Sequence, residues 1–192
     1  MRLLLRLSAA IDRIVTAIGM AGGWIAVPLM AVILYDVVGR RFFNTGSMMI
    51  QDLEWHLHGV LFLSAFGFAY LKDAHVRIEL LRDGWKVRRR AAIEIAGVVF
   101  FIIPLCLLMI LHGYDFAERA FLRNEGAPGG VGLPNRWVIK SFLAFGFSVL
   151  LLAACSVLIK CVAVLTHPAS LGREGAAWLM GEGADPDQIE RT

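Results

Sequence analysis

Two histidines are the residues of this sequence best placed to do chemistry. His58 lies about one turn into one apolar stretch, and His112 lies within a turn of the end of another. Paired imidazoles at matching depth in a bundle of membrane helices could hold a b-type haem. Haem-binding bundles normally bury their histidines away from the helix ends, whereas these two lie near the ends. A haem-bearing membrane anchor of a respiratory enzyme is therefore an alternative hypothesis and not the leading one.

Other combinations of reactive side chains point away from a catalytic or metal site. His56 and His58 are two residues apart, so on a helix they face different directions and would not chelate one metal. Glu54 and His58 are four apart, and we expect them to pair with each other. The sequence has no G-x-S-x-G, Walker A, HExxH or CxxC pattern. We therefore predict no catalytic residue, no metal, no cofactor and no enzymatic activity.

The composition indicates a membrane protein. Of 192 residues, 58% are hydrophobic and 18% are charged, and the mean hydropathy is +0.66. A soluble domain is closer to 45–50% apolar and about 25% charged. The three cysteines, Cys106, Cys155 and Cys161, all lie in apolar runs, which favours small buried side chains over disulfides.

Long stretches that lack charged residues predict four transmembrane helices. A helix needs about 20 apolar residues to cross a hydrocarbon core of about 30 Å. The expected spans cover residues 14–35, 55–71, 95–114 and 141–165, within one domain of residues 14–166. The first span is too long for a signal peptide. Pro28 and Pro104 lie inside spans and predict kinks.

The distribution of basic residues predicts the orientation. With four spans, both termini and the middle loop share one side, which carries 13 lysines and arginines against 6 on the other. The positive-inside rule then places both termini in the cytoplasm. This topology explains the net charge of +3 without a nucleic-acid partner.

The two terminal segments lie outside these spans. Residues 1–13 carry arginines on one helical face and apolar residues largely on the other, which fits either an interfacial helix or an extension of the first span. Residues 167–192 are expected to form a cytoplasmic tail. The middle of each span has no acidic or basic residue, which argues against a self-sufficient pump or channel.

Short motifs at the ends of the spans carry a family resemblance. Residues 36–42 read DVVGRRF, residues 51–55 read QDLEW, residues 72–79 read KDAHVRIE, and residues 133–137 read LPNRW. In this order and spacing they resemble the small membrane subunit, the DctQ type, of tripartite ATP-independent periplasmic (TRAP) transporters. The resemblance covers about residues 14–165, with one departure, since Trp55 follows separated acids rather than preceding an adjacent pair.

The resemblance implies a division of labour. A periplasmic protein captures the solute, a large membrane subunit carries the solute and sodium sites, and the small subunit supports it in a bacterial inner membrane. The stretch around Trp55 to His58 and the Gly-Leu-Pro before Arg136 resemble the branch associated with 2-oxo acids, related carboxylates or mannitol. A tetraspan assembly factor without a transport partner is a third hypothesis.

Within this reading, ten residues have expected structural or partner-binding roles. Six should organise the outer rim, against the large subunit or the docked binding protein: Arg40, Arg41, Glu54, Trp55, Trp137 and Lys140. His58 is expected to pair with Glu54. His75, Arg77 and Glu79 should cap the cytoplasmic end of the second span.

Overall fold

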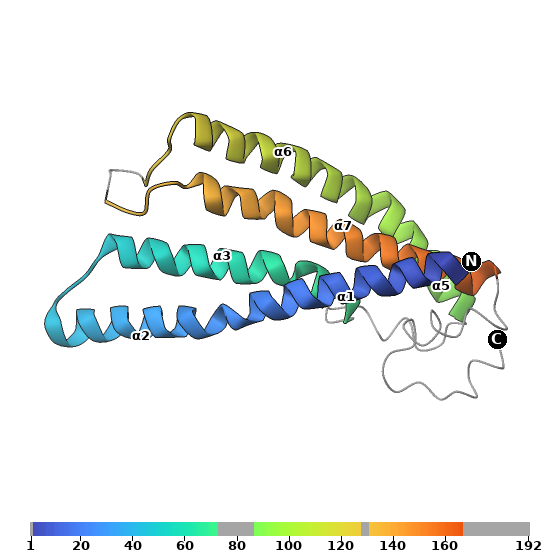
Figure 1. The fold of residues 1–192 in the computed structure, drawn as a ribbon, viewed down its shortest axis with the longest axis horizontal. Coiled ribbons are helices and arrows are strands. Elements are labelled where there is room, and N and C mark those ends of the chain that lie inside the picture. The colour runs from blue at the N-terminus through green and yellow to red at the C-terminus, as the bar shows by residue number, and fades with distance from the viewer. Residues whose placement is uncertain (1, 73–86, 128–130, 167–192) are drawn as a thin grey trace.

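The structure, a computed structural model, describes residues 2–72, 87–127 and 131–166, and every regular element within these ranges is a helix (Figure 1). The elements are α1 (Arg2–Trp24), α2 (Ala26–Phe43), α3 (Met48–Leu71), α5 (Val87–Gly97), the π-helix η1 (Val98–Ile102), α6 (Ile103–Leu122) and α7 (Trp137–Thr166). The expected all-α class is thus confirmed for the described residues.

Helices α1 and α2 form one long rod with a break at Ile25. Pro28 has no N–H, and its ring clashes with the carbonyl four residues earlier, that of Trp24. The chain responds with a tight turn, in which the Ile25 N–H donates to Gly22 O at 3.0 Å. By contrast, α1 runs unbroken across residue 13, so residues 2–13 continue directly into the expected first span.

A second rod consists of α5, η1 and α6 in succession. Pro104 lies in the first turn of α6, directly after η1. Its ring would clash with the carbonyl of Phe100, which lies within η1, and the wider π turn accommodates that clash. Both prolines that were expected to kink a helix therefore coincide with an irregularity in it.

Helix α7 is the centre of the assembly, because α1, α3, α5 and α6 all pack on it. Its buried positions carry small side chains, which allow neighbouring backbones to approach closely. They include Ala153, Ala154, Ser156, Val157 and Cys161.

Glycines make several of these close contacts. Gly19 packs against Phe68 of α3, and a Cβ on Gly67 would lie 2.8 Å from the backbone oxygen of Val149 in α7. The next glycine of α1 to pack on α3 is Gly22 and not Gly23. Nothing lies within 4 Å of a Cβ on Gly23, and Gly22 takes the packing position against Ser64 instead.

Three helical stretches of the described chain are long and apolar enough to cross a membrane. They are Leu3–Phe43, Val87–Leu122 and Trp137–Thr166. Helix α3, which contains the expected span 55–71, is not among them, because polar residues crowd its first turns. The four-span count therefore remains a prediction.

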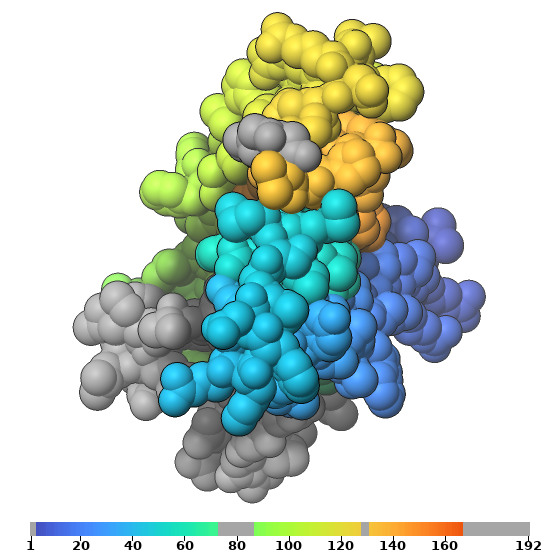
Figure 2. Space-filling model, turned by 90° about the vertical axis from the view of Figure 1, so that its left-hand side faces the viewer, coloured from blue at the N-terminus to red at the C-terminus, as the bar shows by residue number. Residues whose placement is uncertain are grey.

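The two hairpin turns lie together at one end of the molecule. The α2–α3 turn and the α6–α7 connection share this end, whereas the start of α1 and the end of α7 lie at the other (Figure 1). We call the first the hairpin end, comprising residues 35–58, 114–127 and 131–141, and the second the terminal end. Figure 2 looks onto the hairpin end, where residues 131–136 rest against the start of α3.

Candidate functional site

A buried ion pair lies at the hairpin end of α2. The side chain of Asp36 is fully buried, and its Oδ2 accepts a hydrogen bond from Arg40, one turn later on the same helix. Asp36 Oδ1 is buried and has no hydrogen-bond partner within the described residues. Arg40 is thus fixed by Asp36 while remaining 44% exposed, and Arg41 is exposed beside it.

Asp52 ties the α6–α7 connection to the start of α3. Its Oδ2 accepts a hydrogen bond from the backbone N–H of Leu133 at 2.9 Å. Its own carbonyl oxygen lies 2.6 Å from His56 Nδ1, and because a carbonyl can only accept, Nδ1 must carry the proton. Gly132 lets the connection approach this closely, since a Cβ there would lie 2.8 Å from Asp52 Oδ2 and 2.4 Å from Ala127 Cβ.

Replacing Gly132 by alanine is expected to loosen this attachment. The added methyl has no space, and overpacking of this kind costs about 1–3 kcal/mol. Limited digestion with trypsin after Arg136, at the start of α7, should become at least about fivefold faster, since cleavage follows the population of the open connection. The matched control is Gly126→Ala in the same connection, where nothing lies within 4 Å of the new Cβ. Equal cleavage rates in the two variants would show that Gly132 is not a packing constraint.

Lys140 joins α7 to both the connection and α6. Its Nζ donates to Glu125 Oε2 at 2.6 Å and lies 3.9 Å from the centre of the Phe116 ring. That hydrogen bond lowers the pKa of Glu125, a slight loss of hydration opposes the shift, and the charges of Lys140, Arg136 and Arg123 lower the pKa further. Glu125 is therefore the one carboxylate among several cations.

Acidification is expected to release Lys140 from Glu125. The pKa of Glu125 in the folded chain lies below the unfolded value of about 4.3. The pair therefore stabilises the fold above the unfolded value, and this contribution is lost as the pH falls through the folded value. Carbon-13 NMR of the Glu125 carboxyl should give a depressed midpoint that rises in Lys140→Gln. The same midpoint in both proteins would refute the assignment.

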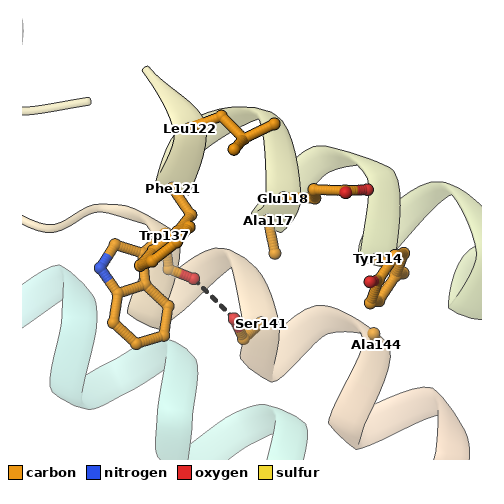
Figure 3. A pocket seen from close by; sticks show the side chains of 8 residues that line it. All are labelled: Tyr114, Ala117, Glu118, Phe121, Leu122, Trp137, Ser141 and Ala144. Atoms are coloured by element: carbon orange, nitrogen blue, oxygen red, sulfur yellow. Dashed lines mark hydrogen bonds between the residues drawn. The ribbon is translucent and has the colours of Figure 1, made fainter. Parts of the chain in front are cut away.

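An apolar pocket of about 500 Å³ lies on another side of the α6–α7 pair (Figure 3). Trp137 packs edge-to-face on Phe121, with ring centres 5.4 Å apart. Ser141 Oγ donates to Trp137 O at 2.7 Å, so this hydroxyl already has an acceptor within its own helix. Glu118 is the one charged side chain in the lining. The pocket has the chemistry of an apolar contact surface.

Comparison with known protein families shows which family the chain belongs to. The family described as "Tripartite ATP-independent periplasmic transporters, DctQ component" matches residues 29–164, more than two thirds of the sequence. The chain belongs to the DctQ family. Comparisons with curated proteins and with solved structures gave no match. The resemblance seen in the sequence is thereby confirmed: this is the small membrane subunit of a TRAP transporter.

Not all the expected site residues of this DctQ subunit come together. Trp55 is exposed at the hairpin end, and the expected pair of Glu54 with His58 does not form. Glu54 Oε1 is buried without a hydrogen-bond partner among the described residues, and the pair spaced by four on this helix is Asp52 with His56. The expected caps His75, Arg77 and Glu79 lie outside the described residues.

The geometry gives no support to the haem alternative. His58 on α3 and His112 on α6 are both exposed. Helix α7 packs against both α3 and α6, whereas these two make no comparable contact with each other. Two axial imidazoles would need helices that face each other, and α3 and α6 are separated by α7.

A polar cluster at the terminal end of the DctQ subunit is absent from the sequence predictions. Ser156 Oγ donates to Asp12 Oδ1 at 2.5 Å, so the hydroxyl of Ser8, 2.7 Å away, must donate to Ser156. Lys160 Nζ donates to Asp12 Oδ2 at 2.6 Å. Lys160 of α7 thus pairs with an aspartate of α1. Ser8 and Asp12 are four residues apart, as are Ser156 and Lys160, so each pair shares one face of its helix. Two such polar faces in apolar helices were the sequence feature that could have predicted this cluster.

Proposed function

We propose that this subunit is a non-catalytic scaffold in a sodium-coupled TRAP importer of a carboxylate-type solute, such as a 2-oxo acid or another organic acid, or of a mannitol-like solute. It acts with a large membrane subunit, which carries the solute and sodium, and with a periplasmic substrate-binding protein. Family membership is the observation that carries this proposal. The chain offers no charged cluster midway along its apolar helices through which a solute could pass.

The proposed location is a bacterial inner membrane with four spans and both termini in the cytoplasm. The excess of 13 basic residues over 6 on the terminal side supports this orientation. Under it, the hairpin end faces the periplasm, and Arg40, Arg41, Trp55, Trp137 and Lys140 form the rim toward the partners. His58 and Glu54 complete that rim at the start of α3.

Exposed apolar surface supports a partner within the membrane. Helix α2 packs chiefly on α3 and leaves large side chains uncovered. They include Val27, Met30, Leu34, Val38 and Phe42. A seven-residue apolar recess of about 670 Å³ lies at the hairpin end of the same helix. This surface is available to lipid and to the large subunit.

Purification of the tagged chain from its native membrane tests the proposal. A multi-span protein of at least about twice its size should accompany it, and Arg40→Glu, which reverses the charge beside Asp36, should reduce that recovery. Arg13→Glu at the other end is the matched control, since Arg13 is exposed and away from the rim. Recovery of the tagged chain without any such partner would contradict the assigned role.

A further inference from the structure

A small cationic recess lies on α6 and α7, and of its lining residues the proposed function uses Lys140 alone. It encloses about 230 Å³, and its lining residues are Phe116, Arg119, Arg123, Glu125 and Lys140. The Glu125 carboxylate accepts a 2.6 Å hydrogen bond from Lys140 Nζ. The recess therefore has three cations and one carboxylate, a net excess of two positive charges.

The two arginines keep free donors. Arg119 Nε donates a hydrogen bond to Asp115 O at 3.1 Å. Its two terminal nitrogens donate to no other described residue and can therefore bind a ligand. The Arg123 side chain makes no hydrogen bond or ion pair with any other described residue, and both arginines are exposed. A guanidinium presents a planar set of donors that matches the oxygens of a phosphate group.

The same face of α6 continues from the recess as an apolar track. Leu105, Leu108 and Phe116 are about half exposed and share this face with Arg119 and Arg123. Steps of three or four residues, with exposed His112 between Leu108 and Phe116, keep all of them on one side of the helix. Along this face of α6, apolar side chains therefore give way to positively charged ones toward the C-terminal end of the helix.

The length of this track matches one leaflet of a bilayer. From Leu105 to Arg119 the helix rises by 14 residues at 1.5 Å each, or roughly 21 Å. Half of a bilayer of about 40–45 Å, headgroups included, has the same thickness. A soluble partner would explain the cations and leave the exposed leucines unexplained, whereas a phospholipid accounts for both.

We propose that this recess binds the phosphate of an anionic phospholipid, of the phosphatidylglycerol type, whose acyl chain lies along Leu105, Leu108 and Phe116. The inference rests on α6 crossing the membrane and does not depend on the transported solute. A lipid held here would link α6 to α7 at the level of the headgroups.

Native mass spectrometry of the full chain in detergent, with dioleoylphosphatidylglycerol and dioleoylphosphatidylcholine added in equal amounts, tests the proposal. The wild type should retain phosphatidylglycerol preferentially. Each exposed arginine near a membrane surface contributes about fivefold in affinity, so Arg119→Gln with Arg123→Gln should weaken retention about 25-fold. Arg123→Lys should keep most of the retention. Arg41→Gln, exposed at the same end on α2, should leave it within about twofold.

Three results would overturn the proposal. The first is equal retention of the two lipids. The second is displacement of phosphatidylglycerol by an equal concentration of inorganic phosphate, which would indicate a site for a soluble anion. The third is unchanged lipid retention in the double variant together with weaker capture of the periplasmic binding protein. Both arginines are exposed, so the variants are expected to fold, and their melting temperatures provide the check.

Discussion

Gly67→Ala is expected to lower the free energy of unfolding by about 3 kcal/mol, because it adds a methyl where three helices meet. The new Cβ would lie 2.8 Å from Val149 O and Cγ1 in α7 and 2.9 Å from Val15 Cγ1 in α1. A backbone oxygen cannot rotate away as a flexible side chain can, so α3 must move. A melting curve followed by size-exclusion chromatography should show the loss, together with reduced recovery of the large subunit.

Gly97→Ala is the matched control for this substitution. Gly97 ends α5, and nothing lies within 4 Å of a Cβ built there. Alanine is favoured over glycine in a helix by about 1 kcal/mol, so this variant should be as stable as the wild type or more so. If the two variants melt at the same temperature, the close packing of α1, α3 and α7 is not what holds the subunit together.

Asp12→Ala is expected to destabilise the subunit by about 2 kcal/mol, by freeing α1 from α7 at the terminal end. Asp12 accepts hydrogen bonds from both Ser156 and Lys160, and hydrogen bonds to charged groups contribute roughly 1.5–3 kcal/mol. Removing it also leaves the Lys160 ammonium, which is 13% exposed, without this counter-charge. The accessibility of a cysteine introduced at exposed Ala9 should rise as α1 separates.

A double-mutant cycle separates the pair from its surroundings. Asp12→Ala with Lys160→Ala should be less destabilised than the sum of the two single variants, because neither charge is then left alone. The expected coupling is about 1 kcal/mol, reduced by the partial exposure of Asp12. Strict additivity would show that the two side chains do not stabilise the fold as a pair.

Periodicity and composition predicted the positions of the helices in the sequence better than they predicted which helices pack against one another. Of the four charge-free runs, three lie within helices that the structure shows to be long and apolar enough to span a membrane. They did not show that the helices extend beyond the charge-free runs, nor that α7 is central, because the sequence alone does not reveal which apolar face of a helix is covered. Gly22 rather than Gly23 packs on α3 because neighbouring residues of a helix point about 100° apart, and the sequence does not show which of the two directions faces α3.

Polar contacts between distant residues were the least predictable feature. The sequence predicted that Arg40, Trp55 and Lys140 lie at one end of the bundle, because each lies near the same end of its expected span. Asp36 lies one turn from Arg40 on the same helix, so this pair could have been predicted from spacing. The contacts of Asp52 with Leu133 N and of Glu125 with Lys140 join residues 81 and 15 apart, and no spacing rule predicts them. Sequence spacing favours Glu54–His58, but the orientation of α3 makes Asp52–His56 the closer pair.

The central claim is that this subunit supports a carrier and carries nothing itself. Reconstitution into liposomes under an inward sodium gradient tests it most directly, with uptake of labelled organic acids measured for the chain alone and together with its large subunit and binding protein. We expect uptake above that of empty liposomes only for the complete assembly. Sodium-driven accumulation by the chain alone would contradict it.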